Sequence, residues 1–222
     1  MNWDERVDAW ERVAATPAFQ QLADHVVDAA APTDRDRVVD LGAGTGLLTF
    51  RLAPVVHDVI ALDASAVMMT RLVDRSHEQG LTNIEGVVAD LRTLPLADGS
   101  RSLAISNYAF HHLDHDGKLA ALREVRRVLE PGGRVVICDM MFAISWRGRD
   151  RRIILDKIRL LLRRGPAGVG RILRNVGRVA TGNWEHPESP HAWETMLREA
   201  GFTQIASLEL ANESGLVVAH RG

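Results

Sequence analysis

The sequence predicts a doubly wound α/β fold: a seven-stranded sheet, mostly parallel, with helices on both faces and an antiparallel hairpin at its C-terminal end. Two features predict it. Short apolar segments alternate along the chain with longer segments of helical periodicity, which is the pattern of βαβ units. A glycine-rich turn lies within RVVDLGAGTGLLTF (37–50), where the first strand passes into a helix.

The individual elements follow from apolar spacing and from residues that begin or end helices. Residues 6–30 carry apolar side chains at helical spacing, with an interruption near Pro17. Ser65 and Gly80 suit the two ends of a helix over 66–79. The last two strands lie too close in sequence for a helical crossover, so we expect them to be antiparallel. The other predicted helices are 47–55, 118–129 (stopped by Pro131-Gly132-Gly133) and 190–200, and the predicted strands are 37–41, 58–63, 83–90, 102–107, 134–140, 203–210 and 215–220.

Length and composition suit a single globular domain of 222 residues, 46% of them hydrophobic and 25% charged. No segment approaches the ~20 apolar residues that a membrane span needs. The charged N-terminus lacks the apolar stretch of a secretory signal. Cys138 is the only cysteine, so we expect a reducing compartment, the cytoplasm. Within the domain we distinguish an N-terminal helical flap (1–36), a core (37–140), a basic helical insertion (141–188), and a last helix with the hairpin (189–222).

The glycine-rich turn predicts a ligand site beyond the first strand. Such a turn lets the backbone approach a ligand closely and directs helix N–H groups at polar or anionic atoms. In open α/β sheets the ligand lies beyond the carboxyl ends of the strands. The dinucleotide pattern G-x-G-x-x-G/A fails here, because Leu47 occupies its third small position. The chain instead reads D-x-G-x-G-x-G from Asp40 to Gly46.

This motif and four further segments, in the same order, resemble class I S-adenosylmethionine (SAM)-dependent methyltransferases. The nearest similarity is to the small-molecule branch of the ubiquinone/menaquinone-biosynthesis type, with a methyltransferase domain 11-like sequence. The further segments are ALDAS (61–65), GVVADLRTLPLADGS (86–100), ISNYAFHHLDHD (105–116) and LREVRRVLEPGGRVVICD (122–139). The resemblance covers about residues 37–140 and the final hairpin. It implies a Rossmann-like fold and SAM as cofactor.

For the methionine half of SAM, the resemblance implies a site around the glycine loop. The loop Gly42-Ala43-Gly44-Thr45-Gly46 is expected to wrap the methionine moiety. Asp40 would hold the ammonium group, directly or through water. Asn107, at the end of the fourth strand, would line the same end of the cofactor.

For the adenosine half, the resemblance implies carboxylates at the ends of strands. Asp63, followed by Ala64, would accept both ribose hydroxyls, because a carboxylate offers two acceptor oxygens. Asp90 would accept from the adenine amino group, with the backbone N–H of Leu91 nearby. Met68 either packs against adenine or belongs to the core.

Catalytic candidates lie where the acceptor must enter. SAM carries an activated methyl group, so alignment of the acceptor supplies much of the rate, and a hydroxyl acceptor also benefits from a general base. The candidates are Tyr108, His111 and His112, and either histidine can act as a base or only shape the loop. Asp139, which ends the fifth strand, is another candidate. No cysteine, histidine or carboxylate cluster in the sequence suggests a metal site, so none is expected.

The insertion concentrates positive charge. Residues 141–183 hold eleven Arg/Lys and two Asp, a net charge of +9 in a chain of net charge −2. Residues 151–164 and 171–180 place apolar side chains on one helical face and arginines on another. Three interpretations are open: a lid packed on the core, a cap that recruits an acidic or amphiphilic acceptor or rests on anionic lipid, and a nucleic-acid contact. Trp184 and His186 are expected either to line the acceptor pocket or to pack, and Trp3, Arg6 and Trp10 are expected in the flap over the cofactor.

The expected function is transfer of a methyl group from SAM to oxygen, nitrogen or carbon of a small or amphiphilic acceptor by in-line displacement. Two alternatives are open: a SAM-binding regulatory module without turnover, and a methyltransferase that acts on RNA. The segment Asn107-Tyr108-Ala109-Phe110 lacks the N-P-P-Y signature of enzymes that methylate base amino groups. The negative net charge also argues against nucleic acid as a partner.

Overall fold

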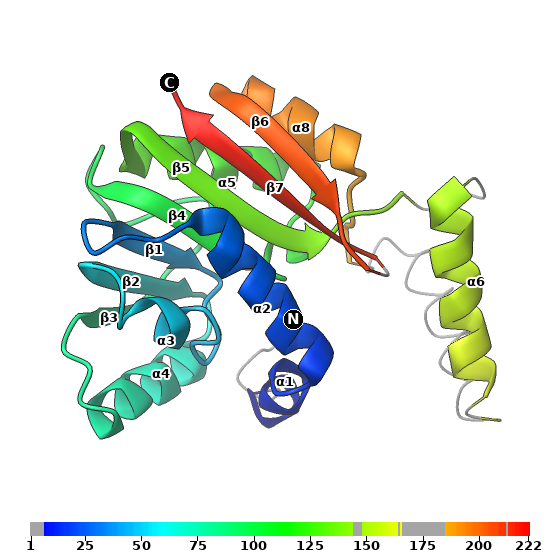
Figure 1. Cartoon of the computed structure of the whole chain (residues 1–222), viewed down its shortest axis with the longest axis horizontal. Helices are drawn as coiled ribbons and strands as arrows, with labels where there is room; N and C mark the ends of the chain where they lie inside the picture. The colour runs from blue at the N-terminus through cyan, green and yellow to red at the C-terminus, as the bar shows by residue number, and fades with distance from the viewer. Residues whose placement is uncertain (1–6, 144–147, 164, 166–184, 212) are drawn as a thin grey trace.

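The computed structural model describes residues 7–143, 148–163, 165, 185–211 and 213–222. Its sheet has seven strands in the order β3-β2-β1-β4-β5-β7-β6 (Figure 1). Strands β1 to β5 pair in parallel, and β7 pairs antiparallel with both β5 and β6, which confirms the predicted fold class. The strands are β1 Arg37–Leu41, β2 Asp58–Asp63, β3 Ile84–Val88, β4 Arg101–Asn107, β5 Leu129–Met140, β6 Phe202–Glu209 and β7 Ser214–Arg221.

Helices cover both faces of the sheet, because neighbouring residues of each strand point to opposite sides. Val38 is buried against α2 and α3, whereas the next residue, Val39, is buried against α5 and α8. On the same side as α2, helix α4 packs its methionines on Ala61 of β2. The helices are α1 Val7–Ala14, α2 Pro17–Ala30, α3 Thr49–Leu52, α4 Ala66–Glu78, the 3₁₀ helix η2 Phe110–His112, α5 His115–Val128, α6 Gly148–Leu162 and α8 Pro190–Glu199.

Three predicted boundaries were wrong, each for a local reason. Helix α5 begins at His115 rather than 118, because Asp114 accepts a hydrogen bond of 2.8 Å from the Gly117 N–H as its N-cap. Helix α3 is a single turn rather than 47–55, and Pro54 just after it has no N–H to extend it. Strand β5 begins at Leu129, which pairs with Arg101 before a register shift.

Other sequence features behave as predicted. The Ser65 hydroxyl accepts a hydrogen bond of 3.2 Å from the Met68 N–H and caps α4. Gly80 follows that helix with a φ of 67°, a conformation that glycine adopts at little cost. In the described part of the chain, no helix is long and apolar enough to cross a membrane.

Helix α6 stands apart from the layered body (Figure 1). It belongs to the basic insertion, and its first turns pack Ile153 on Met140 and Phe142 at the end of β5. Of the predictions for the insertion and the flap, those on Trp3, Arg6, Trp184 and residues 171–180 lie outside the described residues.

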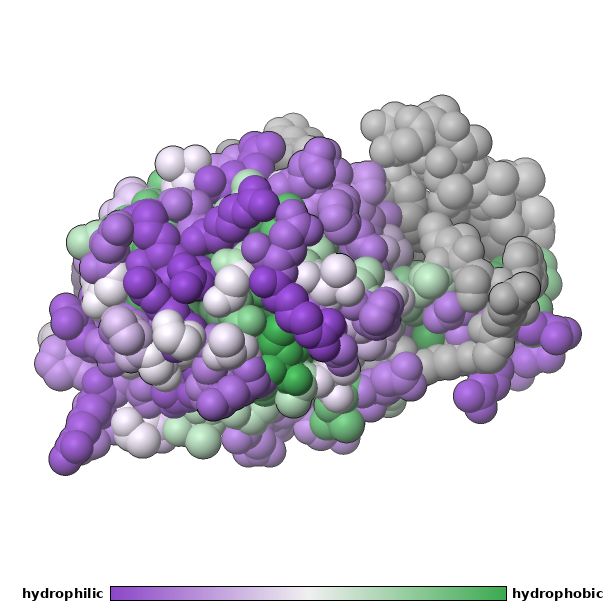
Figure 2. All heavy atoms as spheres, turned by 90° about the horizontal axis from the view of Figure 1, so that it is seen from above, coloured by the Kyte–Doolittle hydropathy of each residue, from purple (hydrophilic) through white to green (hydrophobic). Residues whose placement is uncertain are grey.

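The face seen in Figure 2 is mostly hydrophilic, with hydrophobic residues gathered in one patch near its middle.

Candidate functional site

The glycine loop lies where the strand order reverses, between β1 and β4. The Gly42 N–H donates to the Leu62 carbonyl at 2.8 Å, which ties the loop to β2. Gly42 has a φ of 72°, and a Cβ there would lie 2.3 Å from the Ala109 Cβ. A Cβ on Gly44 would lie 2.7 Å from the Trp10 ring nitrogen. Any side chain at these two positions would therefore collide with Ala109 or Trp10, so the loop requires glycine at both.

A cavity of about 750 Å³, including its open mouth, extends from this loop along the carboxyl edge of the sheet. Nine predicted cofactor or acceptor residues from four separate segments meet in its wall. These nine are Gly42, Gly44, Asp63, Ala64, Met68, Asp90, Leu91, Tyr108 and His112. A smaller cavity beside it is lined by the predicted residues Asp40, Ala43 and Asn107, and by Gly42 again.

Two predicted loop residues line neither cavity. The Thr45 carbonyl accepts a hydrogen bond of 2.9 Å from Arg75, and Thr45 is buried. Gly46 faces inward, where a Cβ would lie 2.4 Å from the Phe50 ring. These residues shape the loop from behind.

The smaller cavity has unusual electrostatics. The Asp40 carboxylate is 1% exposed and accepts a hydrogen bond of 2.6 Å from the Thr49 hydroxyl. Burial raises the pKa of Asp40 to about 7, although the Thr49 hydrogen bonds act in the opposite direction. The side-chain oxygen and nitrogen of Asn107 are buried with no hydrogen-bond partner. A buried carboxyl and an unsatisfied amide fit the ammonium and carboxylate groups of an amino-acid moiety, which would pair with both.

In the larger cavity Asp63 is held in a fixed orientation. Its Oδ2 accepts from the Gly44 N–H and its Oδ1 from the Ser65 N–H, both at 2.9 Å. Asp90 lies further along the edge and forms an ion pair with Arg92, whose Nε is 2.9 Å from Oδ1. Hydrogen bonding to Arg92 holds the pKa of Asp90 below its usual value. The sequence did not indicate that Arg92 pairs with the Asp90 carboxylate.

The acceptor side contains a buried histidine–carboxylate pair. The Nδ1 atom of His111 lies 2.6 Å from Oδ1 of Asp139, and both side chains are at most 6% exposed. Burial lowers the pKa of His111, but the Asp139 charge and hydrogen bond outweigh it, and the net pKa is raised. The His112 ring contacts the His111 ring at a tilt of 55°, with centroids 3.9 Å apart. His112 faces the cavity, whereas His111 lies behind it.

Tyr108 directly follows β4 and lines the larger cavity. Its hydroxyl is 2.5 Å from the Ser214 hydroxyl, and burial raises its pKa well above the usual value. Its φ of 58° is uncommon for a non-glycine residue and marks local strain. A phenol that is hard to ionise does not suit a general base.

A buried lysine fixes the loop that carries His111 and His112. Lys118 is fully buried, and its Nζ donates to the carbonyls of Leu113 at 2.7 Å and His186 at 2.5 Å. The His186 N–H in turn donates to the His111 carbonyl at 2.8 Å. His186, which we predicted to line the acceptor pocket or to pack, is therefore tied by its backbone to the loop and lines neither cavity. Nothing in the sequence pattern indicated Lys118.

Other residues of the cavity wall were also missed, or were assigned only to a flap. They are Trp10, Ala89, Ala109 and Leu113. Ala89 and Ala109 each stand beside a predicted residue, so proximity in sequence was the one available signal. Among the described residues, no group of three or more His, Cys, Asp or Glu side chains could hold a metal ion.

Comparisons with known proteins agree with this geometry. Residues 38–133 match a family model described as a methyltransferase domain. A demethylmenaquinone methyltransferase of Clavibacter sepedonicus is 31% identical over 202 residues, which cover 87% of this chain and 76% of that protein. A ubiquinone/menaquinone biosynthesis C-methyltransferase of Photorhabdus laumondii is 28% identical, over 96% of this chain and 79% of its own length.

Among solved structures, the fold is similar to a SAM-dependent methyltransferase from Aquifex aeolicus. The TM-score is 0.69 at 18% identity, over 99% of this chain and 98% of that chain. The fold, the methyltransferase match and the two relatives, each matched over more than two thirds of its length, lead to one conclusion: this chain belongs to the SAM-dependent methyltransferases, in the branch similar to the quinone-biosynthesis enzymes.

Proposed function

We propose that the protein transfers a methyl group from SAM to a ring carbon or oxygen of a small amphiphilic hydroquinone or phenol. One observation carries the proposal: a single cavity has Asp63 and the glycine loop in one part of its wall and Tyr108 and His112 in another. SAM would supply a methyl group on a sulfonium: attack by the acceptor in line with the S–CH₃ bond breaks that bond, and S-adenosylhomocysteine leaves. The names of two relatives, which refer to demethylmenaquinone and to ubiquinone/menaquinone biosynthesis, support a quinol-type acceptor.

The cofactor residues divide by chemistry. We assign the ribose hydroxyls to Asp63, whose orientation two backbone N–H groups fix. Asp40 and Asn107 would pair with the ammonium and carboxylate groups. At the adenine end, Met68 would pack on the ring, and Asp90 would share its carboxylate between Arg92 and the amino group. The backbone N–H of Leu91 lies beside them.

On the acceptor side, we assign the general base to His112, which faces the cavity. A ring nitrogen of His112 would take the proton of the acceptor hydroxyl, so that the electron pair of that O–H bond becomes available for attack on the methyl carbon. His111 and Asp139 act behind it as a positioning pair. Tyr108 excludes water from this part of the cavity and does not exchange a proton.

The test is methyl transfer from isotopically labelled SAM to a panel of acceptors, read by mass spectrometry. The panel holds short-chain and long-chain hydroquinones, substituted phenols and an RNA oligonucleotide. We expect a labelled hydroquinone or phenol. Binding of S-adenosylhomocysteine without transfer to any acceptor would instead support a regulatory module, and labelled RNA would support the nucleic-acid alternative.

The proposed location is the cytoplasm, which the single cysteine, Cys138, supports. The proposed partner is the small or amphiphilic acceptor itself. An acceptor of this class partitions into membranes.

A further inference from the structure

Helix α6 is fixed at one side and exposed at the other. Ile153 is 7% exposed and packs with Met140 and Phe142 in a cluster that Tyr108 also contacts. Tyr108 at the same time lines the larger cavity. The helix is therefore connected to the acceptor wall through one layer of side chains.

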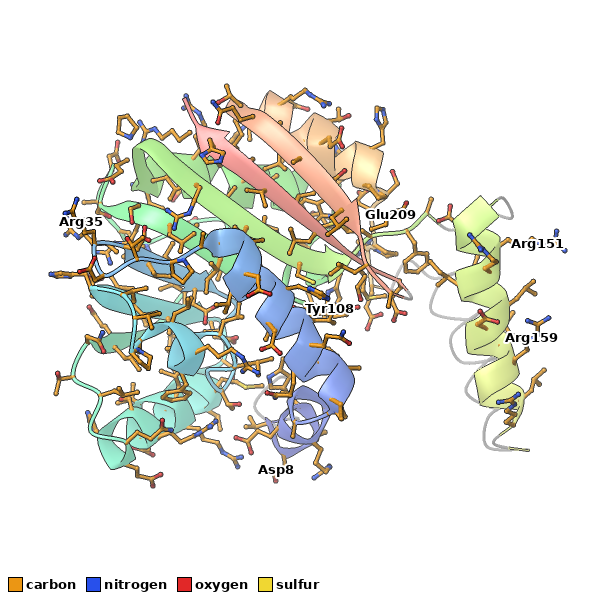
Figure 3. All side chains as sticks on the ribbon, viewed as in Figure 1. Asp8, Arg35, Tyr108, Arg151, Arg159 and Glu209 are labelled. Carbon is orange, nitrogen blue, oxygen red and sulfur yellow. The ribbon has the colours of Figure 1, made fainter. Side chains whose placement is uncertain are left out.

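About a quarter turn around α6 from Ile153, the helix carries a stripe of arginines. Arg152, Arg159 and Arg163 recur at intervals of seven and four residues, which places them on one helical face. These three and Arg151 are all exposed. Figure 3 shows Arg151 and Arg159 pointing away from the body of the protein. One nearby acid, Asp156, pairs with Arg159 at 3.1 Å, so the net charge of the arginine stripe remains positive.

A strip of large apolar side chains runs beside these arginines. Leu155, Ile158 and Leu162 follow one another at three- and four-residue spacing along α6. Leu162 is 52% exposed, and the other two are partly exposed. Exposed and partly exposed apolar side chains flanked by arginines are typical of helices that lie in a membrane interface, with the apolar strip at the acyl boundary and the basic side chains among the headgroups.

We propose that α6 is a docking helix for an anionic phospholipid membrane. The charge of the whole insertion, +9 over residues 141–183 in a chain of −2, is complementary to such a surface. The proposal deepens the proposed function and rests on it in one respect: an amphiphilic acceptor would leave the bilayer beside α6 and reach the cavity past Tyr108.

The test is sedimentation of the full chain with vesicles of phosphatidylcholine, with or without 30% phosphatidylglycerol as a chosen composition. We expect binding to the anionic vesicles that weakens steeply as NaCl rises. Replacing Arg151, Arg152, Arg159 and Arg163 by glutamine should reduce vesicle binding by roughly tenfold or more. Glutamine keeps high helix propensity, so the helix should persist.

The matched control replaces four exposed arginines elsewhere, which changes the net charge equally. Arg35, Arg37, Arg123 and Arg198 are exposed and lie outside α6. This variant should keep most of the vesicle binding, and both variants should bind S-adenosylhomocysteine normally. Failure of the wild type to bind anionic vesicles at low salt, or equal losses in the two variants, overturns the proposal. Arginine-dependent binding to RNA with none to vesicles overturns it as well.

This experiment is independent of methyl transfer, because vesicle binding needs no acceptor. If vesicle binding fails but a short-chain hydroquinone is still methylated, only the docking helix is lost. If vesicles bind but no acceptor is methylated, the proposed function is lost and the docking helix stands.

Discussion

His111 is bound twice by one carboxylate. Its ring Nδ1 lies 2.6 Å from Oδ1 of Asp139, and its backbone N–H donates to Oδ2 at 3.1 Å. The second contact fixes the start of η2, and the first fixes the ring that the His112 ring contacts. Asp139 therefore fixes the position of His111 and, by its charge, raises the His111 pKa.

Replacing Asp139 by Asn should lower the pKa of His111. The carboxylate raises this pKa, and burial of the ring lowers it, so loss of the charge leaves burial dominant. We expect a value below that of an exposed histidine. The measurement is NMR titration of labelled histidine rings, and exposed His57 is the internal control. An unchanged His111 pKa in the variant would contradict the assignment of Asp139 as its partner.

Replacing His112 by Gln should reduce kcat by roughly 10²-fold or more, the usual contribution of a general base. Binding of S-adenosylhomocysteine should change little, because the glycine loop and Asp63 are untouched. The measurement is the rate of transfer to the hydroquinone that the panel identifies, as a function of pH. The wild-type acid limb should be absent from the variant. A variant with wild-type kcat would show that His112 only shapes the loop.

Replacing Asp63 by Ala should weaken SAM and S-adenosylhomocysteine alike, by about 1–3 kcal/mol, the effect of leaving buried hydrogen-bond groups unpaired. Calorimetric titration measures both affinities. Asp74→Ala, on the exposed side of the helix that follows Asp63, is the matched control and should bind normally. Equal affinities for Asp63→Ala and the wild type would refute the ribose assignment.

The sequence predicted those parts of the site that a parallel sheet imposes. Asp63 and Asn107 end their strands, Asp40 lies one residue before the end of its strand, and parallel strands end at one edge, so the proximity of the three follows from the alternating pattern alone. The glycine loop was equally predictable, because the spacing of its glycines reflects the positive φ angles that the turn requires. Identification of these residues with SAM came from the resemblance, since carboxylates at strand ends suit many ligands.

The pairings between side chains were not predictable in the same way. Asp139 and His111 were each chosen as candidates, but their contact depends on the β4–β5 register, which places Asn107 opposite Cys138. Arg92 could equally have extended into solvent, and its rotamer decides that it pairs with Asp90. Lys118 lies on a helix that reads as amphipathic, where a lysine is ordinarily exposed.

SAM binding should release a proton near neutral pH. With a pKa of about 7, Asp40 is mostly protonated at pH 6 in the protein alone, and a cofactor ammonium beside it would favour the ionised form. Binding of S-adenosylhomocysteine at pH 6 should therefore release close to one proton, and at pH 8 almost none. Calorimetry in buffers of different ionisation enthalpy counts these protons. Release that persists in Asp40→Asn, or that is equal at both pH values, would contradict this assignment.

Arg71 should control how fast the cofactor leaves. Helix α1 covers the glycine loop through Val7 and Trp10, and Arg71 of α4 holds it there by ion pairs with Asp8 at 2.7 Å and Glu11 at 2.9 Å. Replacing Arg71 by Ala should let α1 separate from α4 and speed dissociation of S-adenosylhomocysteine by roughly two- to fivefold, a factor in keeping with exposed ion pairs. Stopped-flow tryptophan fluorescence measures this rate.

Salt provides an independent check of the same contact. High NaCl screens exposed ion pairs, so it should speed dissociation from the wild type and leave Arg71→Ala almost unchanged. Arg123→Ala is the matched control. Arg123 lies on the remote helix α5 and pairs with Glu199 of α8 at 3.2 Å. That variant should behave as the wild type at every salt concentration. If Arg71→Ala and Arg123→Ala release the cofactor at the same rate, α1 is held by its apolar contacts alone, and the ion pairs with Asp8 and Glu11 have no part in gating the site.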